Sequence, residues 1–183
     1  MARALILVDI QAGFSDPYWG ARNNPDAEEK AGRLLAHWRG NGWPVFLIQH
    51  LSTNPDSPLY PGKPGVALHP AIAPQPGEPV IQKSANSAFI GTDLEARLRA
   101  NGITDLVVAG ITTPHCVSTT CRMGANLGFN VTLVHDATAA FSEGANTAWR
   151  GGGEVDPDMI HQSAIDHIAG EFVTVCSTAE ALA

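Results

Sequence analysis

The stretch Leu5-Ile6-Leu7-Val8, followed at once by Asp9, decides the fold class of this chain. An apolar run without alternation indicates a strand that is buried on both faces, as in parallel sheets. Further runs of this kind recur along the chain at residues 45–48, 80–81, 106–109, 131–134 and 172–175. The sequence therefore predicts six strands in a mostly parallel sheet.

Amphipathic segments fill most of the gaps between these runs. Residues 26–39 carry apolar side chains at helical spacing, and Gly40-Asn41-Gly42 follows as a stop signal. Further helices are predicted over 92–100, 115–127 and 157–168. Thr92 and Glu95 fit a capping box. Alternating strands and helices are typical of α/β proteins, so we expect one domain over residues 1–183, a Rossmann-like three-layer sandwich with helices on both faces of the sheet.

The composition excludes several classes of protein. The chain has 183 residues, 44% of them hydrophobic, and a formal charge of −7, which disfavours nucleic acid and anionic membranes as partners. No apolar run approaches the roughly 18 residues of a membrane span, and no signal peptide is expected. Three cysteines suggest reduced thiols and a cytoplasmic location. Since no Gly-x-Gly-x-x-Gly opens a helix, we expect no dinucleotide. No other cofactor is expected.

The segment between the second and third predicted strands breaks the pattern. Residues 51–79 hold eight of the thirteen prolines, so no long helix is expected there. A structureless connection of this length is often functional in a compact domain. The segment could therefore complete a binding site, or it could be an ordered surface or oligomer-contact loop.

Polar residues stand where the predicted strands end. Ligands of open parallel sheets bind outside the carboxyl ends of the strands. The residues at or after these ends are Asp9, His50, Lys83, Thr112, Thr113, Cys116 and Asp136. Asp9 could act there as a general base, and Lys83 could stabilise negative charge. The alternative is that Asp9 binds loop amides and Lys83 is a solvated surface residue.

Cys116 is the most informative of these residues, because it opens the helix predicted over 115–127. Free N–H groups and the helix dipole favour a thiolate at a helix N-terminus, and a nearby lysine adds to the effect. A thiolate attacks carbonyl carbon, so we expect an activated nucleophile. The alternative is a small buried apolar side chain. Cys121 lies on another face of the same helix, and Cys176 is expected in the core.

These residues belong to an ordered set of segments. The set comprises Leu7-Val8-Asp9-Ile10-Gln11, Lys83-Ser84-Ala85-Asn86-Ser87-Ala88-Phe89, Gly110-Ile111-Thr112-Thr113-Pro114-His115-Cys116-Val117, Thr120-Cys121-Arg122-Met123 and Leu127-Gly128-Phe129. From about Ala4 to Glu180 the chain resembles the isochorismatase-like cysteine hydrolases. The resemblance implies a six-stranded parallel sheet flanked by helices. It also implies a catalytic triad of Asp9, Lys83 and Cys116.

The same resemblance implies further features of the site and of the assembly. The peptide bond between Ile111 and Thr112 is expected to be cis. The backbone N–H groups of Thr112 and Cys116 would then form an oxyanion hole. A homo-oligomer, either a dimer or a tetramer, is also expected.

The chain departs from the family at the metal site of its nicotinamidases. Those members carry an Asp-x-His site after the second strand, whereas this chain has Gln49-His50 there. His50 and His69 alone are too few ligands, so no metal is expected. Aromatic and polar residues near the triad could line a pocket for a small-molecule substrate. These candidates are Gln11, Phe14, Trp19, His50 and Phe89.

The sequence thus predicts a cysteine-dependent hydrolase of a small amide or other C–N substrate, acting through a thioester. The presence of Cys116 favours this reaction over vinyl-ether cleavage, because family members that cleave vinyl ethers tend to lack this cysteine. One alternative keeps the vinyl-ether reaction, with Asp9 as proton donor and Cys116 incidental. The other is a non-catalytic α/β protein, either oligomeric or thiol-sensing.

Overall fold

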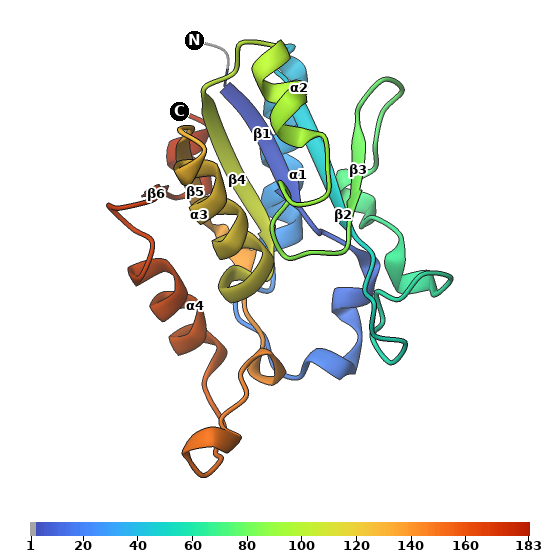
Figure 1. The fold of residues 1–183 in the computed structure, drawn as a ribbon, viewed down its shortest axis with the longest axis vertical. Helices are drawn as coiled ribbons and strands as arrows, with labels where there is room; N and C mark the ends of the chain where they lie inside the picture. Colours follow the sequence, from blue (N-terminus) through green and yellow to red (C-terminus); the bar gives the residue numbers. More distant parts are fainter. Residues whose placement is uncertain (1–2) are drawn as a thin grey trace.

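A single parallel sheet forms the centre of the molecule (Figure 1). The computed structural model describes residues 3–183. Its strands are β1 (Arg3–Val8), β2 (Val45–His50), β3 (Val80–Lys83), β4 (Asp105–Ile111), β5 (Asn130–Ala139) and β6 (Thr174–Cys176). Their order is β3-β2-β1-β4-β5-β6, and every neighbouring pair is parallel. The predicted fold class is confirmed.

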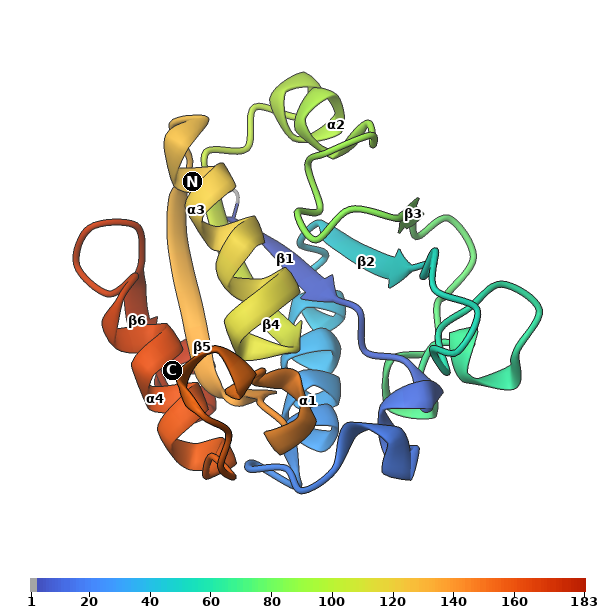
Figure 2. The same cartoon turned by 60° about the horizontal axis from the view of Figure 1, so that its bottom comes forward.

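Helices cover both faces of this sheet (Figure 2). They are α1 (Ala27–Gly40), α2 (Leu94–Ala100), α3 (Ser118–Asn126), α4 (Pro157–Asp166) and α5 (Thr178–Ala181). Alternate residues of β1 face opposite layers: Ile6 packs toward α2 and α3, and Leu7 packs toward α1. Both side chains are fully buried, which explains why the first strand is continuously apolar. No helix within residues 3–183 is long and apolar enough to cross a membrane.

Strand β5 is longer than the sequence suggests, and this corrects the place of Asp136. The pairing of β4 with β5 shifts register between Val108 and Gly110, so β5 continues to Ala139. Asp136 therefore lies within the strand instead of at its end. Its Oδ1 accepts hydrogen bonds from the backbone and the hydroxyl of Thr178, at 2.7 and 2.8 Å. Asp136 thus anchors α5 and is not part of a site.

The start of α2 also differs from the prediction. Asp93 is the N-cap residue, and the capping box of Thr92 and Glu95 does not form. The Thr92 hydroxyl donates to the carbonyl of Ala88 at 2.6 Å, while Glu95 binds Arg99 one turn along the helix. Both side chains therefore form other hydrogen bonds in place of those of a capping box.

The proline-rich segment, residues 51–79, is an ordered loop with two short 3-10 turns. It packs against the chain that follows β1: the Ala12 N–H donates to the carbonyl of Ala67 at 2.8 Å. A side chain on Gly13 would approach the carbonyl of Gly65 to 2.9 Å, so the two backbones need glycine to come this close. The loop is thereby held beside the carboxyl ends of β1 and β2.

Candidate active site

The ends of three adjacent strands bring together the first charged residues of the site. Asp9 directly follows β1, while His50 and Lys83 are paired at the ends of β2 and β3. Lys83 Nζ donates to Asp9 Oδ2 at 2.5 Å, and neither side chain has any exposed area. Asp9 adopts a left-handed conformation with φ of 53°, which turns the chain away at the end of its strand. The carboxyl end of the sheet therefore positions a fully buried ion pair.

The ammonium group of Lys83 has two further acceptors. The carbonyl oxygen of Ala85 lies 3.1 Å from Nζ, and Nδ1 of His50 lies 3.2 Å from it. Together with Asp9, these groups match the three N–H donors of a lysine ammonium. A buried cation is stable only when it is paired and hydrogen-bonded, and this one is.

Cys116 enters the site from the turn after β4. Residues Thr113–Val117 form a π-helical turn, and α3 begins only at Ser118. Cys116 therefore does not open an α-helix, which corrects the sequence interpretation. Its Sγ lies within 4.8 Å of both a carboxylate oxygen of Asp9 and a ring nitrogen of His50. The structure thus brings Asp9, Lys83 and Cys116 together, as the resemblance implied.

Burial controls the protonation of these groups. Desolvation, strengthened by the charge of Asp9, raises the pKa of the Cys116 thiol to about 12, and Lys83 offsets only part of the rise. Here the loss of water outweighs the effect of the nearby cation, which by itself favours a thiolate. Burial also raises the pKa of Asp9 above its usual value, against the opposing effect of Lys83. Both changes favour a resting thiol and a more basic carboxylate.

One oxygen of this carboxylate is free. Asp9 Oδ1 is buried and has no hydrogen-bond donor among the residues that the structure describes. Its other oxygen, Oδ2, is bound by Lys83. An unpaired buried acceptor costs about 1–3 kcal/mol, so such an atom calls for an explanation. A carboxylate that receives a proton from the neighbouring Cys116 provides one.

The turn before Cys116 carries the predicted backbone feature. The peptide bond between Ile111 and Thr112 is cis, as expected from the resemblance. Thr112 lines the same pocket as Cys116. The role of their N–H groups as an oxyanion hole stays a prediction.

These groups open into a small pocket of about 140 Å³. It is lined by Asp9, Phe14, Trp19, His50, Leu59, Asn86, Thr112, His115 and Cys116. Phe14 and Trp19 form an aromatic wall with ring centroids 4.9 Å apart. The indole N–H of Trp19 donates to the carbonyl of Gly13 at 2.8 Å, so this wall presents mainly its apolar surface. The pocket therefore has one apolar side and one polar side.

Three pocket residues were not among the sequence candidates. Asn86 and His115 lie inside the segments that carry the family resemblance, which is the signal that could have found them. Cys116 Sγ is 4.0 Å from Asn86 Oδ1. Leu59 comes from the proline-rich loop, and no local pattern marks it. That loop therefore contributes to the pocket as well as to the surface.

Two sequence candidates do not line the pocket. Gln11 is buried, and its amide binds the backbone of His50: Nε2 donates to the carbonyl at 3.0 Å, and Oε1 accepts from the N–H at 2.8 Å. Phe89 stacks on Phe129 in the core, with ring centroids 5.9 Å apart. Gln11 thus holds β2 in place, and Phe89 is a packing residue.

The metal site of the family's nicotinamidases does not fit the residues here. His69 accepts a hydrogen bond from Ala71 in a 3-10 turn and is absent from the pocket lining. Within residues 3–183, the group whose ligand atoms are close enough for a metal is Asp9, His50 and Cys116. The Lys83 ammonium already occupies an oxygen of Asp9 and Nδ1 of His50. A metal cation would have to displace it.

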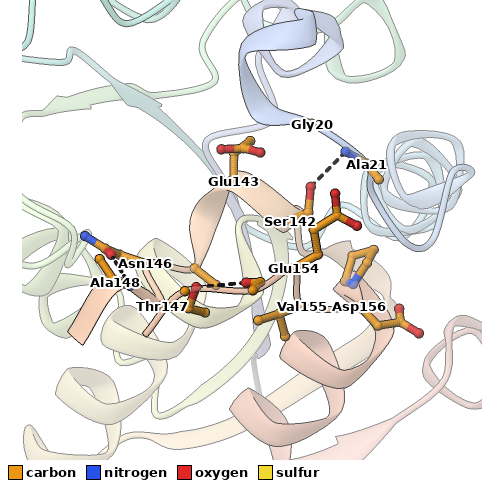
Figure 3. A pocket seen from close by; sticks show the side chains of 14 residues that line it. Gly20, Ala21, Ser142, Glu143, Asn146, Thr147, Ala148, Glu154, Val155 and Asp156 are labelled. Carbon is orange, nitrogen blue, oxygen red and sulfur yellow. Dashed lines mark hydrogen bonds between the residues drawn. The ribbon is translucent and has the colours of Figure 1, made fainter. Parts of the chain in front are cut away.

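A second, larger hollow lies elsewhere, between residues 20–21 and the segment 142–157 (Figure 3). Its volume is about 1,090 Å³. Its charged residues Glu143, Glu154 and Asp156 are all exposed carboxylates. Asp156 accepts from the Asp158 N–H at the start of α4, which is a capping role. The hollow has acidic charge, and none of its lining residues is buried.

Comparison with known proteins agrees with this fold, which is that of a parallel α/β protein. The family model for the isochorismatase domain matches residues 3–180. The chain is 45% identical to the isochorismatase family protein YrdC of Bacillus subtilis, over 96% of this chain and 92% of that protein. The chain therefore belongs to the isochorismatase family, whose members are hydrolases.

Other relatives carry more specific names. A streptothricin hydrolase of Streptomyces noursei is 37% identical over 76% of this chain and 50% of its own length. The ureidoacrylate amidohydrolase RutB of Methylobacterium radiotolerans is 28% identical over 84% of this chain and 61% of its own length.

Solved structures of the family are also similar. A hydrolase of the isochorismatase family from Chromobacterium violaceum has a TM-score of 0.92 at 45% identity, covering 99% of this chain and 92% of its own. A cysteine hydrolase from Pseudomonas syringae pv. phaseolicola has a TM-score of 0.86 at 27% identity, covering 99% of this chain and 91% of its own.

Proposed function

We propose that this protein hydrolyses a small amide or a related C–N bond, with Cys116 as nucleophile and a thioester intermediate. The observation that carries the proposal is the free, buried Oδ1 of Asp9, on a carboxylate that has an oxygen within 4.8 Å of the Cys116 sulfur. A thiol whose pKa is raised by burial needs such a base to become a nucleophile. The relatives named as an amidohydrolase and as a cysteine hydrolase support the same reaction class.

The first half of the reaction forms the thioester. Asp9 takes the thiol proton of Cys116 while the sulfur attacks the substrate carbonyl carbon. The N–H groups of Thr112 and Cys116 stabilise the oxyanion of the tetrahedral intermediate. The C–N bond then breaks, the amine leaves with the proton held by Asp9, and the acyl group stays on sulfur.

The second half returns the enzyme to its starting state. Asp9 accepts a proton from water, and the resulting hydroxide attacks the thioester carbon. The C–S bond breaks, the carboxylic acid is released, and the thiol regains its proton. Lys83 keeps its charge throughout, so Asp9, Lys83, Cys116 and the bound substrate are together neutral before and after each proton transfer. This matters because a net charge in a buried site is costly.

The size of the pocket supports a small substrate. Its 140 Å³ corresponds to about five water molecules and is below the roughly 300–1,000 Å³ of ordinary ligand sites. A cytoplasmic location and a homo-oligomeric assembly belong to the same proposal and rest on the reduced thiols and on the family resemblance.

The proposal is tested by measuring ammonia release from a set of small primary amides. Cys116→Ser should lower kcat/KM by at least about a thousandfold, because the hydroxyl is a far weaker nucleophile in this site. The matched control is Cys121→Ser at a buried core position, which should stay near wild-type activity in the folded fraction.

Two results would count against the proposal. Unchanged hydrolysis by Cys116→Ser would favour the vinyl-ether reaction, with Asp9 as proton donor. No turnover of any amide, together with a Cys116 no more reactive than Cys121 toward alkylating reagents, would favour a non-catalytic protein.

A further inference from the structure

The hydrogen bonds of Lys83 determine the state of a neighbouring residue. An ammonium group has three donors and no acceptor. Its contact with Nδ1 of His50, at 3.2 Å, is therefore a hydrogen bond only if Nδ1 is the acceptor and carries no hydrogen. The other two donors are used by Asp9 and Ala85.

The remaining ring hydrogen of His50 must then lie on Nε2. A doubly protonated ring would place an N–H against the Lys83 ammonium. Burial and the charge of Lys83 lower the pKa of His50 to about 4, so the ring is neutral near pH 7. Neutral imidazole with Nδ1 unprotonated is the Nε2–H tautomer.

The ring that carries this N–H is held in a fixed place at the pocket. His50 lines the pocket, and no acceptor for its Nε2 is found among residues 3–183. The side chain of Gln11 binds both the N–H and the carbonyl of His50, which fixes its backbone. Lys83 fixes the ring from the other side. A donor of this kind is available to a bound molecule without rearrangement.

The charge balance of the pocket adds a second condition. Its charged lining residue is Asp9, which is neutralised by Lys83 behind it. His50 is neutral, and the wall of Phe14 and Trp19 is apolar. A charged ligand would lose its water here without gaining a counter-ion, whereas an uncharged polar ligand would gain a hydrogen bond.

We propose that His50, held as the Nε2–H tautomer by Lys83, donates a hydrogen bond to the bound substrate, and that the site selects small uncharged amides with an acceptor atom within reach of this donor. The selection of amides rests on the proposed function. The tautomer of His50 does not depend on it.

Nitrogen NMR of the histidine rings tests the tautomer directly. In the wild-type protein at pH 7, long-range ¹⁵N–¹H spectra should show His50 with a protonated Nε2 and an unprotonated Nδ1. The His50→Gln variant, by loss of one set of signals, identifies which ring is His50. A His50 ring that is protonated on Nδ1, or on both nitrogens, overturns the proposal.

Alkylation of Cys116 tests the recognition. Iodoacetamide and iodoacetate are of equal size and differ in charge. In both reactions the sulfur forms a bond to the methylene carbon, iodide leaves, and the thiol proton passes to the solvent. For each thiol, the rate with iodoacetamide is divided by the rate with iodoacetate. This ratio should be at least about tenfold higher for Cys116 than for glutathione. The rate at Cys116 should also saturate as the iodoacetamide concentration rises.

Variants at His50 separate recognition from structure. His50→Gln keeps an N–H donor near the Nε2 position and should retain the preference for the amide within about threefold. His50→Phe removes the donor and should lower the saturable rate of Cys116 alkylation by iodoacetamide by about tenfold or more. The control His69→Gln lies outside the pocket and should match wild type.

The outcomes distinguish this inference from the proposed function. Two outcomes overturn the role of His50 without contradicting Cys116 as the nucleophile. The first is labelling of Cys116 with no preference for iodoacetamide over iodoacetate. The second is a folded His50→Phe variant that keeps the wild-type preference. Absence of labelling at Cys116 while Cys176 reacts contradicts the proposed function itself. If His50→Phe does not fold, the NMR measurement on the wild type still decides the tautomer.

Discussion

Two hollows of this molecule, the one between residues 20–21 and 142–157 and the one beside Cys116, differ in size, charge and origin. The larger, about 1,090 Å³, is formed mainly by the segment 142–157 and carries exposed carboxylates, of which Asp156 caps α4. The smaller, about 140 Å³, lies at the ends of β1, β2 and β4 and contains a fully buried ion pair beside a thiol. Volume is therefore a poor guide to chemistry here. What distinguishes the small hollow is that its charged groups are removed from water and held by several partners.

This difference follows from how the two regions are built. Strand ends are fixed by the ladders of the sheet, so a side chain such as Lys83 can be held against Asp9 across β2. The wall of the large hollow is held by hydrogen bonds at exposed positions, such as the Thr147 hydroxyl to the carbonyl of Gly153 at 2.8 Å and the Ala21 N–H to Ser142 Oγ at 3.0 Å. Changes in the small hollow should consequently have large effects, and changes in the large one small effects.

The largest effect is expected from Lys83→Met. Removing the cation leaves the Asp9 carboxylate buried without its partner, which should lower the free energy of unfolding by about 3–5 kcal/mol. The double variant Asp9→Asn/Lys83→Met should recover part of this loss. Urea unfolding measures both. The matched change Lys30→Met removes a partly exposed pair with Asp26 and should cost about 1 kcal/mol or less. Equal losses at Lys83 and Lys30 would contradict the comparison.

The next effect concerns the reactivity of Cys116 toward iodoacetamide in the absence of other ligands. With a pKa of about 12, the rate should rise about tenfold per pH unit from pH 7 to pH 10 without a plateau. Glutathione under the same conditions should approach a plateau above about pH 9. Peptide mass spectrometry gives the rate at each cysteine. A plateau for Cys116 below pH 8 would show a resting thiolate and would contradict this prediction.

A smaller effect is the pH dependence of stability due to His50. Its pKa is lowered to about 4 in the folded protein, while an unfolded histidine titrates near pH 6.5. As the pH falls below 6.5, the unfolded state takes up a proton that the folded state does not. The contribution of His50 to the free energy of unfolding is therefore fully present above pH 6.5 and is lost as the pH falls toward 4.

This contribution is isolated by comparing wild type with His50→Gln. Allowing for the partial exposure of His50, the wild type should lose about 1 kcal/mol more than the variant between pH 7 and pH 5, measured by urea unfolding. His115 and His161, whose pKa values are also lowered by burial, are present in both proteins and cancel in the difference. Equal losses would show that His50 is protonated as easily in the folded protein as in the unfolded one.

The smallest effect is expected in the large hollow. Glu154→Gln removes an exposed carboxylate and should change the free energy of unfolding by no more than about 0.5 kcal/mol. Amide hydrolysis should stay within about twofold of wild type. A loss of stability or activity as large as that of Lys83→Met would show that this hollow matters for folding or catalysis and would contradict the comparison between the two regions.

The sheet and the strand-end residues could be predicted because they follow from local patterns. Continuous apolar runs mark strands covered on both faces, and the rule that ligands bind at carboxyl ends singled out Asp9, His50 and Lys83. These three residues do meet, over 74 positions of chain between Asp9 and Lys83.

The remainder depends on tertiary structure. The raised pKa of Cys116 results from loss of water, which no local pattern encodes. Asp136 was misplaced because a shift in strand pairing lengthens β5. Gln11 reads as a polar pocket residue, yet the backbone of His50 satisfies its amide. Leu59 reaches the pocket through a loop held in place by the chain after β1.

The position of Leu59 has a consequence for how such a protein could diversify. It is the one pocket-lining residue that the proline-rich loop supplies within the described part of the chain. The reacting groups stand on the sheet edge and its adjoining turn, whereas this part of the wall belongs to a separate segment. Mutation could therefore widen or narrow the cavity while leaving the proton-transfer machinery unaltered. Substrate range and catalytic chemistry can then be inherited, and selected, as separate traits.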